Sequence, residues 1–350
     1  MTTNRSPLID VQLVAWNGQD FLPECLRSLQ AQHASNWKFW AIDNNSTDGS
    51  AILLKDFSAK LGGNFIANDS NVGFAKAHNH LAALGQAPYI FILNQDVVLG
   101  ADYLKILLAR MESDPSLGST SGLLFQLNKS SAEPQKTTLI DSMGLRLSKS
   151  HRVVEQYRGQ DITKLKLAGG KVEVFGVPAT AALYRRRAIE SINLQKNYKA
   201  ELFDEMFVSY KEDVDLAYRL QLGGWKSSCQ INAVAYHERG LSGERDQGRG
   251  LGSWTTIGRH TKRPLWQSYL SYRNHLYFIF GTSLASSRVE IFAWTAIYEK
   301  IKFLIILFTH PSLLYAWIEV WRKRKLLKRK RQMIRQRNFH PEEIMIWLNK

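Results

Sequence analysis

Cysteine is scarce in this sequence. Among its 350 residues only Cys25 and Cys229 are present, far apart and without a CxxC or zinc-ligand spacing. A disulfide-stapled scaffold and a zinc module built from cysteine pairs are therefore excluded, and a reducing compartment is favoured. We interpret the two residues as inert buried thiols.

Two further patterns are missing. The sequence contains neither GxGxxG nor a Walker motif, so the Rossmann dehydrogenase and P-loop classes lose their main support. No signal peptide is visible, because Met1–Pro7 is short and polar and Ile9–Trp16 already has the pattern of a strand. We therefore do not expect secretion, and a bound phosphate would have to be neutralised by something other than a glycine-rich loop.

Acidic residues are missing from one stretch near the C-terminus. The segment Arg322–Arg337 holds ten Lys or Arg residues and no Asp or Glu, and it accounts for most of the net charge of +15. The preceding part of the chain is only mildly basic. A block of this kind favours a polyanionic neighbour, either nucleic acid or an anionic membrane surface.

The first part of the chain alternates short apolar runs with amphipathic stretches. The runs have the length of strands, and the stretches between them repeat apolar residues at helical spacing. This alternation indicates βαβ units with right-handed crossovers and a mostly parallel sheet. The expected strands are Ile9–Ala15, Lys38–Ile42, Asn64–Ala67 and Tyr89–Leu93, and the expected helices are Gln19–Gln32, Thr47–Lys60 and Phe74–Leu84.

The pattern is looser in the middle of the chain. Residues 117–200 predict short strands and loops, with hairpins around Thr138–Val154 and Val172–Tyr184. Regular periodicity returns in Glu212–Leu222, a helix that two glycines end, and Lys226–Tyr236 is strand-like.

Residues 290–321 are rich in aromatic and branched aliphatic side chains. Phe303–Phe308 is too short to span a bilayer and is followed by the helix breaker Pro311, whereas Phe303–Trp321 as a whole reaches the spanning length of roughly 20 residues. We expect interfacial helices, because the interrupted apolar stretch ends in aromatic residues and a cationic run. One membrane crossing and a soluble helical subdomain are the alternatives.

Polar side chains follow four consecutive expected strands. The carboxyl ends of parallel strands form the ligand-binding edge of open α/β sheets. Any one of these residues alone would fit a turn or a helix cap, but four in succession are hard to attribute to turns. They are Asn17, Asp43 with Asn44 and Asn45, Asn68, and Asn94 with Gln95 and Asp96.

Asp43 and Asp48 belong to the cluster D-N-N-S-T-D-G-S. Thr47 and Asp48 fit the start of the next helix, where Asp48 would be favoured by the helix dipole. Asp43 lies at the strand end and is better placed to accept hydrogen bonds from a nucleobase or a ribose hydroxyl.

Three other acidic or imidazole positions suggest chemistry. Asp96 follows a buried strand and could hold a divalent cation between phosphate oxygens. Glu212 and Asp213 open an amphipathic helix, where acids often serve only the helix dipole but where a carboxylate could also take a proton from a hydroxyl. His237 follows a strand and is either structural or an imidazole ligand to a metal.

Taken in order, several motifs resemble one known family. They are V-A-W-N, D-N-N-S-T-D-G-S, N-V-G-F-A-K-A-H-N, L-N-Q-D-V, the stretch F-D-E-M-F-V-S-Y-K-E-D-V-D-L-A-Y-R, and H-E-R-G-L-S. Between about Val11 and Arg273 the chain resembles family 2 inverting glycosyltransferases of the GT-A fold, in the rhamnosyltransferase-like branch of bacterial cell-surface polysaccharide synthesis. Each motif is moderately specific, and the ordered set is highly specific.

The resemblance implies a role for particular positions. It implies Asp213 as catalytic base, with Glu212 beside it on the acceptor side, and Asp96 and His237 as ligands of Mg²⁺ or Mn²⁺. The donor-binding residues that it implies are Asn17, Asp43, Asp48, Asn71, Gly73, Asn79, Asn94 and Asp96.

The chain departs from the family pattern at two positions. The metal-binding D-x-D motif reads Asn94-Gln95-Asp96, with a single carboxylate, so the metal would be held largely by donor phosphates. Trp16 stands where the family usually has Tyr or a small polar residue, which leaves base recognition open.

The implied protein is an inverting, metal-dependent glycosyltransferase. Residues 1–262 would form the GT-A catalytic domain, with a nucleotide-binding half over about 1–115 and an acceptor half over about 116–262. Residues 263–350 would form a helical, basic extension on the inner face of the cytoplasmic membrane, touching anionic lipid or pairing subunits into an oligomer. The acceptor would be lipid-linked or a polysaccharide.

The branch suggests dTDP-rhamnose as donor, with galactofuranose, galactose and N-acetylglucosamine donors as alternatives. Two other classes compete with a transferase. A nucleic-acid-binding protein could use the same basic block, although the block lacks a known binding module. An inactive scaffold would not need Asp96, Asp213 and His237 together.

Overall fold

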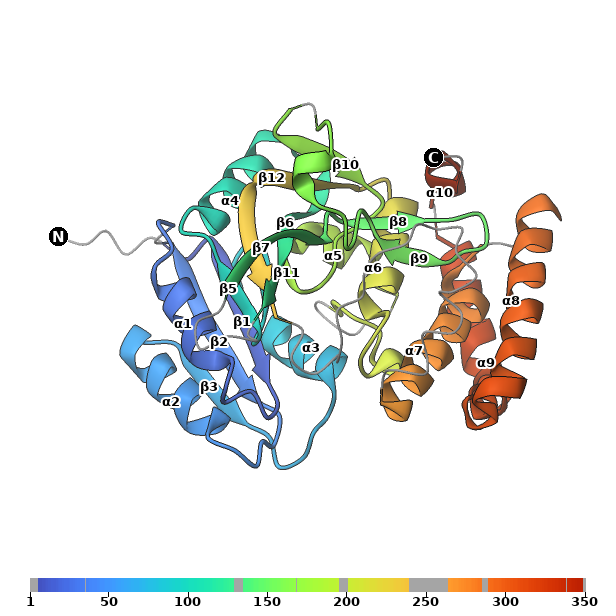
Figure 1. Cartoon of the computed structure of the whole chain (residues 1–350), viewed down its shortest axis with the longest axis horizontal. Coiled ribbons are helices and arrows are strands. Elements are labelled where there is room, and N and C mark those ends of the chain that lie inside the picture. Colours follow the sequence, from blue (N-terminus) through green and yellow to red (C-terminus); the bar gives the residue numbers. More distant parts are fainter. Residues whose placement is uncertain are drawn as a thin grey trace.

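A mixed ten-stranded sheet runs through the first two thirds of the chain. The computed structural model describes residues 6–34, 36–128, 135–167, 169–194, 201–238, 264–284, 289–337 and 339–348. Within them the strand order is β10-β12-β6-β11-β4-β1-β2-β3, with β5 paired to β12 and β7 to β6. Figure 1 shows helices on both faces of this sheet and a stack of helices at the end far from the N-terminus.

The N-terminal half is the predicted set of βαβ units. β1 pairs in parallel with β2 and β4, and β2 pairs in parallel with β3. The central strands are buried on both faces, which explains their uninterrupted apolar sequence. The elements are β1 (Ile9–Ala15), α1 (Leu22–Gln30), β2 (Trp37–Asp43), α2 (Ser50–Leu61), β3 (Asn64–Ala67), α3 (Phe74–Leu84) and β4 (Tyr89–Asn94).

The middle of the chain completes the sheet with antiparallel and parallel strands. β11 lies between β4 and β6 and runs antiparallel to both, whereas β12 runs parallel to β6. The elements are β5 (Val97–Leu99), α4 (Tyr103–Ser113), β6 (Leu117–Asn128), β7 (Gln135–Ser142), β8 (Leu145–Leu147), β9 (Val153–Glu155), β10 (Lys171–Val174), β11 (Ala181–Arg185), α5 (Arg186–Ile192), α6 (Glu212–Leu222) and β12 (Lys226–His237).

Two local expectations for this region were wrong. Val172–Tyr184 is not a hairpin, because β10 pairs with β12 and β11 inserts into the centre of the sheet. Residues 117–128 form one long strand rather than short pieces. Both errors concern partners far apart in sequence, which local patterns do not encode. Within Thr138–Val154, β8 and β9 do form a hairpin.

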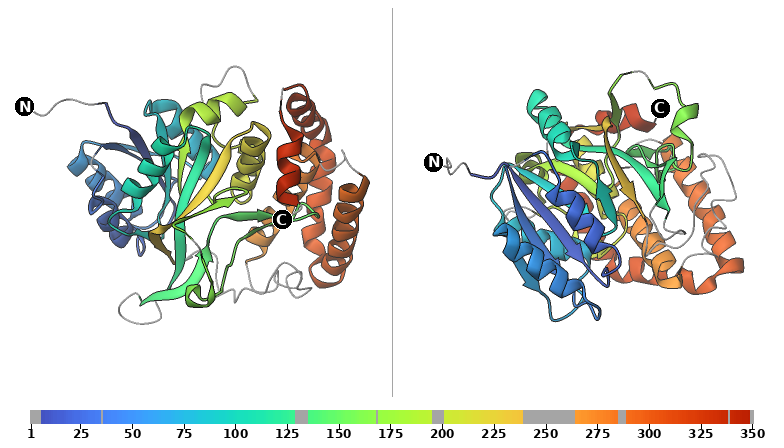
Figure 2. Two further views of the ribbon diagram at one scale, coloured as in Figure 1. Left: turned by 90° about the horizontal axis from the view of Figure 1, so that it is seen from above. Right: turned by 60° about the vertical axis from the view of Figure 1, so that its left-hand side comes forward.

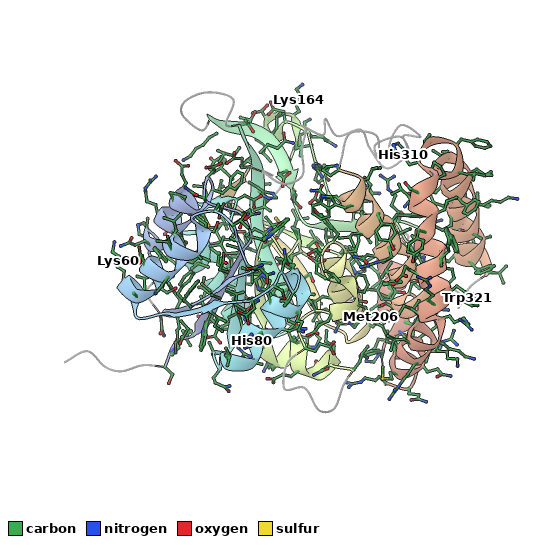
Figure 3. All side chains as sticks on the ribbon, turned by 90° about the horizontal axis from the view of Figure 1, so that it is seen from below. Lys60, His80, Lys164, Met206, His310 and Trp321 are labelled. Atoms are coloured by element: carbon green, nitrogen blue, oxygen red, sulfur yellow. The ribbon has the colours of Figure 1, made fainter. Side chains whose placement is uncertain are left out.

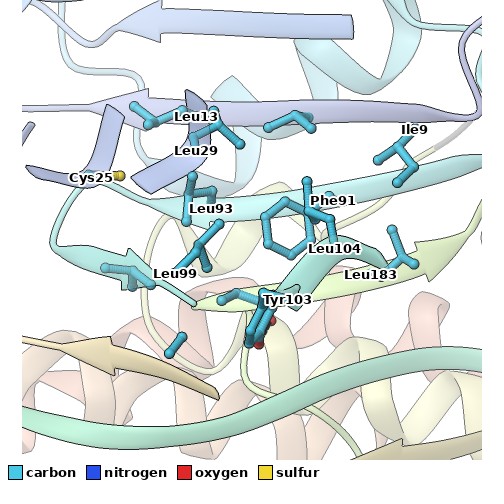
Figure 4. Packing of buried hydrophobic residues seen from close by; sticks show 14 of the residues in the cluster. Ile9, Leu13, Cys25, Leu29, Phe91, Leu93, Leu99, Tyr103, Leu104 and Leu183 are labelled. Carbon is cyan, nitrogen blue, oxygen red and sulfur yellow. Dashed lines mark hydrogen bonds between the residues drawn. The ribbon is translucent and has the colours of Figure 1, made fainter. Parts of the chain in front are cut away.

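Side chains from both sheet halves meet in one core. Figure 4 shows Leu13, Phe91 and Leu93 of the strands packed against Leu29 of α1 and Tyr103 of α4. The Tyr103 hydroxyl is satisfied in this apolar setting, because it donates to the carbonyl of Ala181 and accepts from the backbone N–H of Gly122. Tyr103 therefore ties α4 to β6 and β11.

The C-terminal part consists of helices that lie beside α6 (Figure 2). They are α7 (Leu265–Tyr277), which continues in a π-helical turn (Phe278–Thr282), α8 (Val289–Thr309), α9 (Tyr315–Arg335) and α10 (Pro341–Leu348). In Figure 3, His310 and Trp321 mark this end of the molecule, opposite Lys60 of α2. The predicted boundary at residues 262 and 263 falls in a segment outside the described residues.

The apolar stretch Phe303–Trp321 is not one continuous helix. α8 ends at Thr309, a 3₁₀ turn covers Pro311–Leu314, and α9 begins at Tyr315. The break occurs where the sequence places the helix-disrupting proline. Among the described helices, none combines the length and the apolarity that crossing a membrane requires.

One hydrophobic cluster joins the C-terminal helices to α6. It includes Val214 and Tyr218 of α6, Tyr272 of α7, Leu327 of α9 and Trp347 of α10. Trp347 also donates a hydrogen bond of 3.0 Å from its indole N–H to Gln221. The extension is therefore packed onto the helix that begins with Glu212 and Asp213.

A buried ion cluster lies inside this interface. Lys330 of α9 contacts Asp215 of α6 at 2.5 Å and Asp204 at 2.6 Å, and Arg219 contacts Asp215 at 2.8 Å. Thr282 also donates to Asp215. Burial by itself would raise the pKa of Asp215, but Lys330 and Arg219 outweigh it and lower that pKa to about 2. Part of the basic segment thus faces the protein interior.

Lys330 is expected to carry much of the stability of this interface. Lys330→Met leaves the buried Asp215 and the partly buried Asp204 with one cation fewer, and removing one partner of a buried pair costs about 3–5 kcal/mol. Lys328→Met removes an exposed cation of the same helix and should change stability by no more than about 0.5 kcal/mol. Thermal unfolding checks both variants. Equal melting midpoints for the two would show that the cluster does not hold the helices together.

Candidate active site

The loops after β1 and β2 are tied together by the residues predicted to bind the donor. Asn17, at φ 48°, accepts the backbone N–H of Thr47 with its Oδ1 at 2.9 Å. Asp48 accepts the backbone N–H groups of Gln19 and Ser50 at 3.0 Å each. Because these bonds shape the turn, α2 begins at Ser50 and not at Thr47 as predicted.

Asp43 differs from its neighbours in having a free acceptor. Its Oδ2 accepts the backbone N–H of Ser46 at 2.9 Å, whereas Oδ1 is buried with no hydrogen-bond partner. A buried carboxylate oxygen without a donor is costly, so an incoming N–H or hydroxyl would relieve it. Asp43 is therefore a donor-side carboxylate with unused hydrogen-bonding capacity.

The loop between β3 and α3 is organised by asparagines. Asn44 accepts the Asn68 side-chain amide at 2.9 Å and the backbone N–H of Val72 at 3.2 Å, and Asn71 accepts the N–H of Gly73 at 2.9 Å. Gly73 has φ 86°, which favours glycine. Asn71 and Gly73 thus lie in the loop that follows β3, held to Asn44 at the end of β2.

Asn79 lies further along α3 and uses its side chain elsewhere. Its amide nitrogen donates to the carbonyl of Phe203 at 2.8 Å, and its oxygen accepts the N–H of Phe203 at 2.9 Å. This pair fastens α3 to the segment before α6. The structure does not bring the Asn79 side chain together with the strand-end group of Asn17, Asp43 and Asp48.

The three residues after β4 serve different purposes. Gln95 accepts the backbone N–H of Trp16 at 2.9 Å and donates to the carbonyl of Trp16 at 3.2 Å, so it joins the ends of β1 and β4. Asn94 has a buried Oδ1 with no hydrogen-bond partner. Only Asp96 presents a carboxylate.

Asp96 meets His237 across the sheet edge. β5 pairs antiparallel with β12, which brings the end of β12 beside Val97. His237 Nε2 lies 3.3 Å from Asp96 Oδ1, and His237 Nδ1 lies 2.8 Å from Oδ2 of Asp141, a fully buried residue of β7. Burial would lower the pKa of His237, but the two carboxylates outweigh it and raise that pKa to about 9.

Asp141 is a functional candidate that the sequence reasoning missed. It lies in a segment predicted only as loops and hairpins, and the signal that could have revealed it is an acid between apolar Ile140 and Met143. A carboxylate on one imidazole nitrogen fixes the ring orientation and the tautomer of metal-binding histidines. Asp141 can therefore hold His237 so that Nε2 points toward Asp96.

These side chains fit a divalent cation that takes part of its coordination from a ligand. Asp96 Oδ1, from the turn between β4 and β5, and His237 Nε2, from the end of β12, converge, and these atom types suit Mg²⁺ or Mn²⁺. Among the described residues no group of three or more acidic, histidine or cysteine side chains could hold a metal ion. Phosphate oxygens and water would have to complete the shell.

Glu212 and Asp213 form a buried acid pair at the start of α6. Burial, followed by the neighbouring Asp213, raises the pKa of Glu212 to about 8. Burial also raises the pKa of Asp213, which Lys211 partly offsets. A general base works best when its pKa approaches the working pH, so the upward shift suits Asp213 for proton abstraction.

A short connection brings this acid pair to the metal-fitting end of the sheet. The backbone N–H of Ala179 bonds the Asp213 carboxylate, and the next residue, Thr180, accepts the backbone N–H of Asn94 at 2.9 Å. Asp213 therefore lies one backbone segment away from the end of β4, which carries Asp96. The start of α6 is thus linked through backbone hydrogen bonds to the end of β4.

Comparison with known proteins points to one family. A sequence model described as Glycosyl transferase family 2 matches residues 10–192. TuaG of Bacillus subtilis, whose name describes a teichuronic acid biosynthesis glycosyltransferase, is 27% identical over 96 residues, 27% of this chain. WcaA of Escherichia coli, named for colanic acid biosynthesis, is 28% identical over 110 residues, 31% of this chain. The matched segments span 38% and 39% of these two relatives.

Solved structures share the fold. The chain resembles GalNAc-T7, solved with UDP, GalNAc and Mn²⁺, with a TM-score of 0.56 and 13% identity over 80% of this chain and 49% of that one. It also resembles residues 1–349 of TarS from S. aureus, with a TM-score of 0.51 and 14% identity over 93% of this chain and 90% of that one. The predicted GT-A-like α/β fold is confirmed.

The raised pKa of Glu212 has a consequence for stability. Below its ordinary pKa of 4.5 the acid is protonated in both states, but toward pH 8 only the unfolded state ionises it freely, so stability falls as pH rises. Glu212→Gln should therefore raise the melting midpoint at pH 8 and change it little at pH 4.5. Glu190→Gln, at an exposed acid of α5, is the control. A pH-independent difference would contradict the shift.

Proposed function

Because the chain belongs to glycosyl transferase family 2, we propose that it transfers a sugar from a nucleotide-activated donor to an acceptor hydroxyl, with inversion at the anomeric carbon. Two observations support the proposal: Asp96 contacts His237 at the sheet edge, and the backbone of Ala179 and Thr180 links Asp213 to the end of β4. A donor diphosphate and an acceptor hydroxyl need these two neighbouring environments.

The chain's own residues have distinct tasks in this reaction. Asp213 takes the proton of the acceptor hydroxyl, whose oxygen forms a bond to the anomeric carbon as the bond to the nucleoside diphosphate breaks. One base suffices, in contrast to a glycosidase, which needs two carboxylates flanking the bond. Glu212, protonated at neutral pH, keeps a second negative charge away from Asp213.

The donor-side residues bind and orient the nucleotide. The free Oδ1 of Asp43 accepts a hydrogen bond from the base or ribose, while Asn17 and Asp48 hold the surrounding turn. Asp96 and His237, the latter oriented by Asp141, would hold Mg²⁺ or Mn²⁺, which stabilises the negative charge of the departing diphosphate. GalNAc-T7, which shares the fold, was crystallised with a nucleotide and Mn²⁺.

For the donor sugar the proposal rests on the sequence branch, and for the acceptor it rests on the names of the relatives. L-rhamnose from dTDP-rhamnose is the proposed donor, and nucleotide-activated galactofuranose, galactose and N-acetylglucosamine are the alternatives to be screened with it. The named relatives act in cell-surface polysaccharide synthesis, so the acceptor proposed here is a lipid-linked or polysaccharide glycan.

We also propose that the C-terminal helices dock on the anionic inner surface of the cytoplasmic membrane. α8 exposes several apolar side chains, among them Phe292, which is 58% exposed, and Phe308, which is 83% exposed, and Trp321 of α9 is 64% exposed. Exposed cations follow directly on α9, from Arg322 to Lys325. Apolar insertion beside positive charge matches an anionic lipid surface better than nucleic acid.

Replacing the base should separate chemistry from binding. Asp213→Asn should lower turnover by roughly 10²–10⁴-fold, because general-base catalysis contributes that much. Donor binding should persist, because the substitution removes a proton acceptor and leaves the donor-side residues in place. Binding is measured as a rise of the melting midpoint, which a ligand of the native state produces. Release of nucleoside diphosphate and thermal shifts with each donor, with and without Mn²⁺, provide the readouts.

Asp56→Asn, at an exposed aspartate of α2, is the matched control and should behave as wild type. Normal turnover in Asp213→Asn would remove Asp213 from the mechanism. If no nucleotide sugar shifts the wild-type midpoint or is consumed, the transferase proposal itself fails.

Point variants test membrane docking better than truncation, because deleting α9 would also remove Lys330 from Asp215. Changing Lys323, Arg324, Lys325 and Lys328 to Gln should weaken binding to anionic vesicles by roughly 10²–10³-fold, since each charge near the surface is worth about 1 kcal/mol. Phe292→Ser with Phe308→Ser should also weaken it. Co-sedimentation with phosphatidylserine and phosphatidylcholine vesicles measures both effects. Salt-sensitive binding to DNA but not to vesicles would overturn the proposal.

A further inference from the structure

The backbone just before the acid pair is strained. Val208, Tyr210 and Lys211 have φ of 63°, 71° and 70°, a region that residues with a β-carbon rarely adopt. At Val208, with ψ −67°, the N–H of Ser209 donates to the carbonyl of Phe207 at 2.7 Å and closes a rare three-residue turn. Such a conformation persists only when its surroundings enforce it. We call residues 207–211 the strained turn.

Asn274 of α7 supplies much of that enforcement. Its side-chain nitrogen is buried and lies 2.7 Å from the carbonyl of Phe207, 2.8 Å from that of Ser209 and 2.7 Å from that of Tyr210. Three carbonyls of one turn thus share a single amide group. The carbonyl of Phe207 also accepts the backbone N–H of Ser209, so side-chain and backbone donors together hold the turn.

Arg273 fixes the orientation of that amide. Its Nε and Nη2 donate to Oδ1 of Asn274 at 3.0 and 2.9 Å, so the amide nitrogen must face the strained turn. Nη2 also lies 3.2 Å from the carbonyl of Phe207. The two consecutive residues act as a unit, with the guanidinium holding the oxygen of the amide whose nitrogen holds the turn.

The opposite side of the strained turn rests on the donor-side loop. The backbone N–H of Ala75 donates to the carbonyl of Val208 at 3.0 Å. A β-carbon on Gly73 would come within 2.6 Å of Cγ1 of Val208, so the two segments are in close contact. The strained turn is therefore clamped between the start of α3 and α7.

The strained turn is connected to Asp213, the proposed base, by the backbone of Lys211. Lys211, the last residue of the strained turn, accepts the backbone N–H of Asp215 at 3.1 Å and so starts α6, with Glu212 and Asp213 in its first turn. We propose that Asn274, oriented by Arg273, is a positioning residue that sets the place of Asp213 relative to the donor-side loop. The catalytic part of this inference rests on the proposed function.

The test combines kinetics with a measurement that needs no activity. In Asn274→Ala, backbone amide exchange should accelerate in residues 208–214 and stay unchanged in β1 to β4. The kcat should fall by roughly 10²-fold, since a misplacement of about 1 Å costs that much, while KM for the donor stays within about twofold. Asn274→Ser, which keeps one hydroxyl donor, should give an intermediate kcat.

Tyr272→Phe is the matched control on the same helix. It removes the acceptor of the Trp317 indole N–H, which faces α9 and not the strained turn. It should lower the melting midpoint while leaving kcat and the exchange of residues 208–214 as in wild type. A general loosening of α7 would instead lower kcat in Tyr272→Phe as well, and that result would overturn the positioning role.

Different results would contradict the hold of Asn274 on the strained turn and its effect on Asp213. Unchanged amide exchange in both Asn274 variants would show that Asn274 does not hold the strained turn. Faster exchange with an unchanged kcat would overturn its role in placing Asp213. If wild type consumes no donor, the proposed function fails, and the exchange measurement still decides whether Asn274 is the clamp.

Discussion

Asp215 has to be neutralised inside the protein, and its ion cluster determines how α9 packs against α6. Its carboxylate is fully buried, and Lys330, Arg219 and Thr282 satisfy it from two sides. An unpaired carboxylate at this depth would be strongly destabilising. Because Asp215 lies two residues after Asp213, the same interaction that seats α9 also anchors the helix that carries the proposed base.

The candidate site places its charges in two separate environments. On one side Asp96, His237 and Asp141 form a chain of alternating carboxylate and imidazole. On the other side Glu212 and Asp213 are buried together, and their pKa values are raised. Excess negative charge at one end favours a cation, whereas a weakly acidic carboxyl at the other can accept a proton. A transfer reaction with an anionic leaving group requires both.

The cations of the basic C-terminal segment are divided between the protein interior and the solvent-exposed surface. Lys330 points into the protein, and Arg331 and Arg337 bond backbone carbonyls of Ile279 and Ser191. The cations from Arg322 to Lys325 remain exposed beside the aromatic residues of α8 and α9. Composition alone could not divide the block in this way, because the division depends on which side of α9 meets α6.

Local sequence determined the parallel half of the fold, since strands buried on both faces must be continuously apolar and their crossovers must be helical. It also determined the limits of α6 and the strand-end positions of Asp43 and Asp96. Tertiary structure decided the partners of β10 and β11, the pairing of Asp141 with His237, and the contact of Asn274 with the strained turn. These join residues far apart in the chain, so their partners are chosen by packing and by the need to satisfy buried polar groups, which no local pattern records.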